Sequence, residues 1–420
     1  MKFTMIPQKQ IILIFSLLIC IPGAASGEEI LSEEFGWAQN LTETWELLDY
    51  DANNGIASFS DMEGHAIYQI LLRDPDQAGD DAPALGAQIA SQLAGTETPE
   101  ADTAPFTFSG HNAALTEAKW TAGSNPVHGY IVTIDDKPLE PGASPYPFDY
   151  ILIAFSLEEE FNLYHDFILS NLDGFSPLEE ETPMPGAISL FIRSSGGSPA
   201  APPRLNPVEN PRPGMSSQRM QPMLNLPLEP GSSADIEAAV AVIDREARIL
   251  NQFAEAPEET RTAAWRRFYQ MLYKDSWYDM RSAAEVIAGR LEGHGVMRSE
   301  WPGEILSWVQ NFAYRRTGSL SDLEPAWVCI TEESGDCDSL GLAYMAILEH
   351  LGFESVLMIS EKHGHSLVGV DVNGPGARFP HRGTQWLVAE LTADVSIGMI
   401  AADQSNPEDW MGFDLGFRAE

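Results

Sequence analysis

Three residues in the C-terminal half have the types and spacing of a nucleophilic site: Cys337, His365 and Glu390. Cys337 begins the segment CDSLGLAYMAILEHLG, whose apolar residues recur every three to four positions and predict a helix. A thiol in the first turn of a helix meets unpaired backbone N–H groups and the positive end of the helix dipole, which favour a thiolate and hold a developing oxyanion. The position of Cys337 therefore favours covalent chemistry at sulfur.

The histidine and the acid follow on two predicted strands. His365 begins the alternating run HSLVGVDV, and Glu390 lies near the end of the run TQWLVAELT. If these strands are antiparallel neighbours, Glu390 accepts from one imidazole nitrogen while the other nitrogen faces the thiol. Asp371 and Asp394 are the alternative acids. A lone His or Glu in a strand is more often structural, but the combination with Cys337 favours chemistry.

The thiol has several acidic neighbours. Glu332, Glu333, Asp336 and Asp338 surround Cys337 in sequence and oppose its ionisation. Asp336 also has an ordinary structural role as the residue that caps the helix. We therefore expect a low pKa for Cys337 only if an imidazolium at His365 lies close to it.

Other uses of these residue types are open. His363 and His365 form an H-x-H pair that can bind zinc together with Cys337 or His381, although no second pair with metal spacing accompanies it. Cys329 can form a disulfide with Cys337, or remain a buried thiol in a strand over the run AWVCI. Gln310 can assist an oxyanion, or it can line the core or bond a loop.

The sequence predicts two domains joined by a linker, and the candidate site lies in the second domain. Residues 30–177 have alternating runs, a helical segment and a closing amphipathic helix, which predict an α+β domain. Residues 194–233 are rich in proline and predict an extended linker. After it, residues 235–420 begin with helical periodicity. The strand and helix segments predicted in the first domain are ETWELLDY, GIASFSDM, HAIYQILLRD, Pro83–Leu93, VHGYIVTID, FDYILIAF and Leu157–Leu172.

The N-terminus and the charge bound the compartment and the partners. Residues 1–26 combine two lysines, an apolar run and a small-residue end, and they predict a signal peptide, either cleaved or kept as an anchor. No later stretch is long and apolar enough to span a bilayer. The net charge of −38 repels phosphate backbones, so nucleic acid is excluded as a partner. We expect a secreted or cell-surface protein.

The C-terminal segments resemble a known family. ILSWVQNFAY, GDCDSLGLAYMAILEHLGF, GHSLVGV and WLVAELT, in this order, resemble the secreted archaeal and bacterial branch of the transglutaminase-like superfamily. The resemblance implies a papain-like core with Cys337 as nucleophile, His365 as general base and Glu390 as orienting acid, where the wider superfamily usually has Asp. The N-terminal order of elements more weakly resembles PsbP/Mog1-like domains.

Two functions follow as expectations. The first is an extracytoplasmic cysteine peptidase or amidase that acts on peptide or protein amides without a cofactor, with hydrolysis favoured over cross-linking. The second is a catalytically silent binding or scaffold protein with the same fold, whose N-terminal domain meets a cell-surface partner. A metal-binding module is a third reading.

Overall fold

The computed structural model describes most of the chain and divides it into two compact units. The described residues are 29–51, 55–74, 81–96, 98–139, 144–178, 184–195, 232–316 and 321–415. The first unit comprises Met1–Gly197 and Arg248–Arg267, and the second comprises Ser198–Ala247 and Phe268–Glu420. The predicted signal peptide and nearly all of the predicted linker lie outside the described residues. Both units contain helices and strands, so the chain has the expected α+β class.

The first unit is built on a seven-stranded antiparallel sheet with the order β3-β4-β5-β9-β8-β7-β6. Its strands are β3 (Trp45–Asp51), β4 (Ile56–Asp61), β5 (Ala66–Arg73), β6 (Glu100–Phe108), β7 (His111–Ala122), β8 (Asn125–Pro138) and β9 (Asp149–Leu157). A second, three-stranded sheet contains β1 (Glu29–Ser32), β2 (Trp37–Asn40) and β10 (Phe175–Pro177). The helices of the N-terminal segment are α2 (Ala82–Ala94), α3 (Phe161–Asp173) and α4 (Ala187–Ser195).

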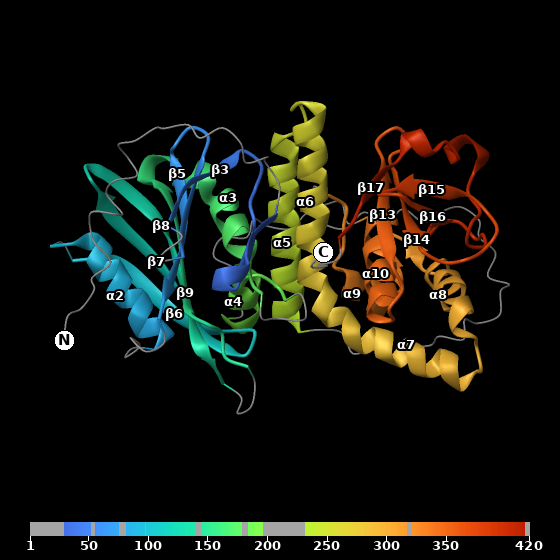
Figure 1. Cartoon of the computed structure of the whole chain (residues 1–420), viewed down its shortest axis with the longest axis horizontal. Coiled ribbons are helices and arrows are strands. Elements are labelled where there is room, and N and C mark those ends of the chain that lie inside the picture. Colours follow the sequence, from blue (N-terminus) through green and yellow to red (C-terminus); the bar gives the residue numbers. More distant parts are fainter. Residues whose placement is uncertain are drawn as a thin grey trace. The chain divides into compact units, whose positions relative to one another are not determined.

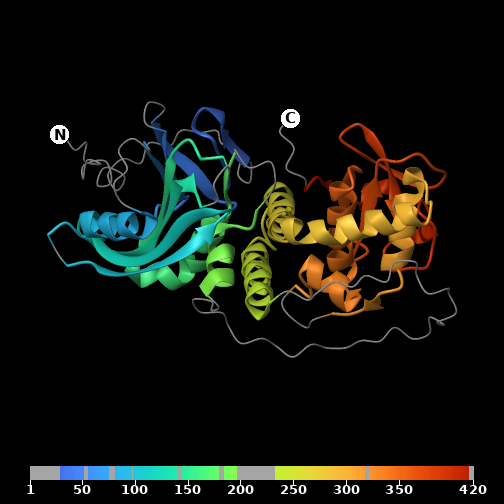
Figure 2. The same cartoon turned by 90° about the horizontal axis from the view of Figure 1, so that it is seen from below.

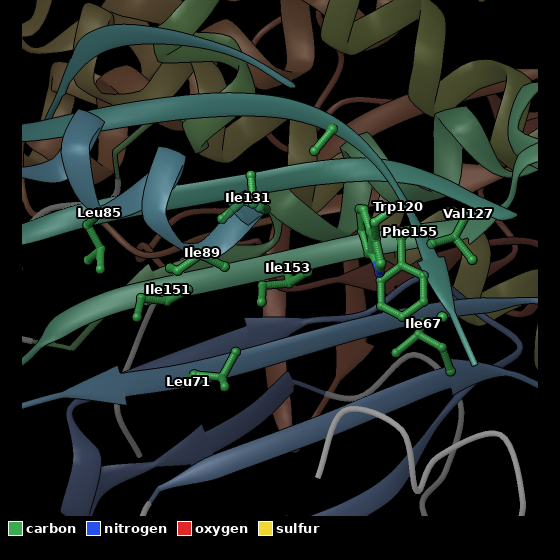
Figure 3. Packing of buried hydrophobic residues seen from close by; sticks show 13 residues of the cluster. Ile67, Leu71, Leu85, Ile89, Trp120, Val127, Ile131, Ile151, Ile153 and Phe155 are labelled. Carbon is green, nitrogen blue, oxygen red and sulfur yellow. The ribbon is translucent and has the colours of Figure 1, made fainter. Parts of the chain in front are cut away.

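Helices α2 and α3 cover opposite faces of the large sheet (Figures 1 and 2). Figure 3 shows Leu85 and Ile89 of α2 above a layer of apolar side chains, with the Trp120 indole against the Phe155 ring. Because side chains alternate along a strand, Tyr130 points away from the Ile131 face and packs instead against Phe161 at the start of α3. The sheet therefore has an apolar layer on each side.

The segment Arg248–Arg267 belongs to the first unit, although the sequence assigns it to the C-terminal domain. The helices concerned are α5 (Ser233–Gln252) and α6 (Glu258–Trp277). Arg248 bonds the carboxylate of Asp166 through two hydrogen bonds of 2.7 and 2.8 Å. The buried Arg267 donates to the backbone carbonyls of Asn40 and Ser170. These long-range pairs are not visible in local sequence patterns, which explains the difference in boundary.

The second unit places one central helix against a five-stranded antiparallel sheet with the order β15-β16-β14-β13-β17. Its further helices are α7 (Arg281–Gly293), α8 (Trp301–Val309), α9 (Ala326–Glu332) and the central α10 (Cys337–His350). The sheet strands are β13 (Ser355–Ser360), β14 (His365–Val370), β15 (Arg378–His381), β16 (Thr384–Ala389) and β17 (Met411–Phe413). A small parallel pair is formed by β11 (Ala313–Tyr314) and β12 (Ser334–Gly335).

Helix α10 covers only one face of this sheet. Gly341 of α10 approaches Leu357 and Val368 so closely that a methyl group there would lie 3.2 and 3.7 Å from their side chains. The opposite face carries its own apolar cluster, which includes Leu367, Trp386 and Trp410. Adjacent residues of β14 therefore point either toward α10 or toward this second cluster.

Two local predictions in this unit were wrong. The run AWVCI forms helix α9 rather than a strand, because Pro325 supplies the residue before the first turn and Glu333 ends the helix in the left-handed conformation, with φ of 49°. The spacing from Pro302 to Tyr314, with Trp308 and Phe312 one turn apart, predicts a single helix, but α8 ends at Val309, and Ala313 and Tyr314 pair with β12. Among the described residues, no helix is both long and apolar enough to cross a membrane.

Candidate active site

Cys337 is the first residue of α10, where the sequence places it. The carboxylate of Asp336 caps the helix by accepting a hydrogen bond of 2.8 Å from the backbone N–H of Ser339. The cap fixes where the helix begins, and so it fixes the direction of the neighbouring thiol. Both Asp336 and Cys337 are buried.

The cap carries a testable consequence for stability. Asp336→Ala is expected to destabilise the protein by about 1 kcal/mol, because it removes the acceptor for the Ser339 N–H. Asp336→Asn keeps an acceptor and is expected to unfold close to the wild-type temperature. Burial, and then the charge of Asp338, raises the pKa of Asp336, so the neutral amide suits the site. Thermal unfolding of both variants tests this difference, and equal losses in the two would contradict it.

His365 and Glu390 form the firmest contact of the candidate site. Strands β14 and β16 are antiparallel, with Val368 opposite Ala389. Continuing this register puts Glu390 opposite Leu367, which shares a face with His365, so the two side chains are diagonal neighbours. Nε2 of His365 lies 2.8 Å from Oε2 of Glu390. Because a carboxylate only accepts, Nε2 carries the hydrogen and Nδ1 is left for another partner.

The second oxygen of Glu390 is held by the chain that follows it. Oε1 accepts hydrogen bonds from the backbone N–H and the hydroxyl of Thr392, at 2.6 and 2.7 Å. Burial raises the pKa of Glu390, but the hydrogen bonds from His365 and Thr392 outweigh it and bring the pKa below its ordinary value of 4.5. Glu390 is therefore a fixed anion at neutral pH. Neither Asp371 nor Asp394 takes this place.

Gln310 holds the backbone beside the acid. Its side-chain amide donates to the carbonyl oxygens of Glu390 and Val395, at 2.8 and 2.9 Å. Both amide hydrogens are thus committed to the loop after β16. Of the roles that the sequence allows for Gln310, the structure shows loop bonding.

The thiol of Cys337 contacts the residues on either side of the pair rather than the pair itself. Its Sγ lies 3.9 Å from Oδ1 of Asp338, and it is near Ser366, the neighbour of His365 on β14. Within the described part of the chain, the thiol makes no hydrogen bond to His365. Burial raises the pKa of Asp338, and His365 lies close enough to that carboxyl to oppose the rise.

The electrostatics of the thiol differ from the expectation. Burial, followed by the carboxylates of Asp338 and Asp336, raises the pKa of Cys337 to about 12. The Ser366 hydroxyl and backbone act in the opposite direction but are weaker. Burial, reinforced by these two carboxylates, therefore favours the neutral thiol in this state. The prediction of a low-pKa thiol was wrong for this state.

By strand period, His365 shares with Leu367 the sheet face opposite α10, and Trp410 of the same apolar cluster lies against its ring. The two rings meet edge to face with centroids 6.2 Å apart, and His363 stacks on the same indole at 5.8 Å. His363 contacts Asp409 at 3.4 Å, and His381 contacts Asp414 at 3.0 Å. Each histidine of the zinc reading thus has a carboxylate of its own.

The structure also bears on the possible disulfide and the possible metal site. Cys329 and Cys337 are both free thiols, and Cys329 is buried and donates to the carbonyl of Ser334. The ligand atoms of Asp336, Cys337 and Asp338 lie within 4.8 Å of one another. These are three consecutive residues at a helix start, and none of the histidines joins them.

Several contact residues escape the sequence patterns. Tyr269 of α6 is buried and hydrogen-bonds the Asp338 carboxylate, whose charge, after burial, raises the pKa of the Tyr269 hydroxyl. Ser366 and Trp410 belong here too. Tyr269 and Trp410 come from segments far from the site in sequence, so only the folded chain brings them in. Ser366 and Thr392 could have been predicted as contact residues, because each is close in sequence to a predicted site residue.

Comparisons with known proteins assign no family. No family model matches the chain. No curated protein matches it either.

Solved structures give weak similarities. A cyanobacterial PsbP from Synechocystis is 13% identical, with a TM-score of 0.29, over 38% of this chain and 96% of the other. LpqN, described as involved in cell envelope biogenesis of Mycobacterium tuberculosis, is 14% identical, with a TM-score of 0.22, over 36% of this chain and 88% of the other. A Pseudomonas aeruginosa protein of unknown function is 10% identical, with a TM-score of 0.21, over 33% and 88% of the two chains. These TM-scores are too low to carry an argument, and none of these similarities supports the transglutaminase-like resemblance.

Proposed function

We propose that the second unit catalyses acyl transfer through Cys337, with His365 as general base and Glu390 as the residue that orients it. The observation that carries the proposal is the His365–Glu390 hydrogen bond of 2.8 Å, together with a cysteine at the first position of a helix whose thiol lies near Ser366, the next residue after His365. This combination is typical of nucleophilic catalysis, in which a base next to the nucleophile is itself oriented by a third group. The transglutaminase-like resemblance, with its papain-like core, supports the same assignment.

The proposed chemistry begins from the neutral thiol. As sulfur attacks the carbonyl carbon of an amide, Nδ1 of His365 takes the thiol proton, so the imidazolium forms against the Glu390 carboxylate. The carbonyl oxygen becomes an oxyanion, which the free N–H groups of the first turn of α10 can bind. Collapse expels the amine, which takes the proton from His365 and leaves a thioester. Water then attacks the thioester, returns the thiol and releases the acid.

The absence of a Cys337–His365 hydrogen bond is compatible with this sequence of steps. In enzymes without substrate, catalytic hydrogen bonds are often long and tighten only in the reacting complex. A thiol with a pKa near 12 also argues against a resting ion pair, so proton transfer must accompany attack. We propose hydrolysis of peptide or protein amides, and a place outside the cytoplasm consistent with the predicted signal peptide. The chain needs no cofactor for these steps.

One observation favours a second candidate, a binding or scaffold protein that keeps the fold without turnover. The same raised pKa of Cys337 that delays ionisation would suit a site that never forms a thiolate. In this reading the His365–Glu390 pair stabilises the sheet, and the first unit supplies the contact with a cell-surface partner.

Acylation by an activated ester separates the two candidates. With p-nitrophenyl acetate, the enzyme reading predicts a burst of one p-nitrophenolate per chain, followed by slower turnover. Cys337→Ala is expected to abolish the burst. Cys329→Ser removes the other described thiol while keeping a donor for Ser334, and it is expected to retain the burst. A wild-type rate equal to that of Cys337→Ala would favour the binding protein.

A further inference from the structure

Asp338, the residue after the proposed nucleophile, has its carboxylate close to the Cys337 thiol. Asp338 lies in the first turn of α10, half-buried, with Oδ1 3.9 Å from Sγ of Cys337. Tyr269 bonds this carboxylate from α6. The carboxylate is therefore held at the nucleophile rather than left free in solvent.

Within the described part of the chain, no Lys or Arg forms an ion pair with the Asp338 carboxylate. The groups that act on it are the Ser366 and Tyr269 hydroxyls, the Cys337 thiol and His365. The first three are neutral, and Nε2 of His365 is committed to Glu390. Even a half-buried carboxylate is costly without a counter-ion, and desolvation accordingly raises the pKa of Asp338. The site is electrostatically incomplete in this state.

A second, independent feature points to a missing ligand. Among the described residues, the buried hydroxyl of Ser366 has no hydrogen-bond partner of normal geometry, although it is close enough to Cys337 and Asp338 to oppose the rise in the pKa of both. Buried polar atoms without partners are rare in folded proteins. A donor-bearing ligand beside the nucleophile would satisfy both the hydroxyl and the carboxylate.

We propose that Asp338 selects substrates that carry an ammonium or guanidinium group next to the acyl group transferred to Cys337. The proposal rests on the proposed acyl transfer for its meaning in catalysis. Burial is the main reason that the thiol stays neutral, and Asp338 is the stronger of the two charges that add to it, so a cation bound at Asp338 cancels that charge. The correct substrate thus helps to ionise its own nucleophile, whereas anionic substrates meet repulsion.

Charged thiol reagents test this selectivity without a known substrate. Cys337 is treated in the presence of EDTA with methanethiosulfonates that carry an ethylammonium, a methyl or an ethylsulfonate group, and modification is located by peptide mass mapping. The ratio of ammonium to sulfonate rates is divided by the same ratio for N-acetylcysteine amide. We expect a normalised ratio on the order of tenfold or more, as for unit charges a few ångströms apart near a protein surface.

Variants separate Asp338 from the overall charge. Asp338→Asn is expected to reduce the normalised ratio several-fold, and Asp338→Glu is expected to restore most of it. Asp371→Asn removes one exposed charge at the other end of β14 and is expected to leave the ratio unchanged. If Asp338→Asn fails to fold, the wild-type ratio at low and high salt decides, because screening must shrink it.

Each outcome bears on the proposal. A normalised ratio near one, a ratio insensitive to Asp338→Asn, or no modification of Cys337 by any reagent would overturn it. Charge selectivity with no His365-dependent acylation would leave the cation site standing and reject the proposed enzyme. His365-dependent acylation without charge selectivity would support the proposed enzyme and reject the cation site.

Discussion

His365→Ala is expected to slow acetylation of Cys337 by p-nitrophenyl acetate about 10²–10⁴-fold, the usual contribution of a positioned general base. The effect should be large because the thiol is neutral at rest, with a pKa near 12, and so needs an acceptor for its proton. Stopped-flow release of p-nitrophenolate measures the rate. The loss should be greatest near neutral pH and should shrink in alkali, where hydroxide can ionise the thiol.

The chain contains a matched control for this variant. His363 lies two residues before His365 and contacts the same Trp410 indole, but its carboxylate partner is Asp409 rather than Glu390. His363→Ala is expected to change the acetylation rate by less than about threefold if only a positioned base contributes. Similar losses in the two variants would mean that packing against Trp410, and not proton transfer, controls the site.

Glu390→Gln is expected to reduce the acetylation rate by about 10²-fold, while the thiol itself stays in place. The neutral amide can still bond the ring, but it no longer stabilises the imidazolium that forms during attack. Asp371→Asn, which removes the exposed alternative acid of β14, is expected to have no effect. A Glu390→Gln rate equal to the wild-type rate would remove Glu390 from the proposed mechanism.

The same variant gives a pH dependence with a defined sign. Because the pKa of Glu390 is lower in the folded chain than its ordinary value of 4.5, ionised Glu390 stabilises the folded state above that pH. The stabilisation is lost as the pH falls through 4.5 toward the lower folded-state pKa. The difference in melting temperature between wild type and Glu390→Gln should therefore be largest near neutrality and should narrow in acid. A difference that grows in acid would contradict the assigned pKa direction.

Much of the local architecture is predictable from the sequence where the apolar period is strong. The helix α10 and the strands β5, β14 and β16 lie within predicted segments, and α2 and β9 extend beyond theirs by one or two residues. Strands β6 and β7 escape the pattern because they are rich in alanine and threonine, and Pro105 interrupts one of them. Helix α9 was assigned to a strand because five apolar residues in a row have no period to read.

The candidate site likewise has a part that the sequence predicts and a part that it does not. Register and period two suffice to bring His365 and Glu390 together, because both residues lie on neighbouring strands of one sheet. They do not reveal the state of the thiol, which depends on how deeply Cys337 and Asp338 are buried and on Tyr269 from a distant helix. Burial is a property of the packed chain, so the helix-start argument alone gave the wrong direction for the pKa of Cys337.

The most direct test of the proposed acyl transfer is the location of the acetyl group after a brief exposure of the wild-type protein to p-nitrophenyl acetate. Peptide mass mapping with and without hydroxylamine distinguishes a thioester from acetylated lysine. The proposed mechanism predicts a hydroxylamine-sensitive acetyl group on Cys337 and an unmodified Cys329. Acetyl groups confined to lysines, or equal labelling of the two cysteines, would contradict it.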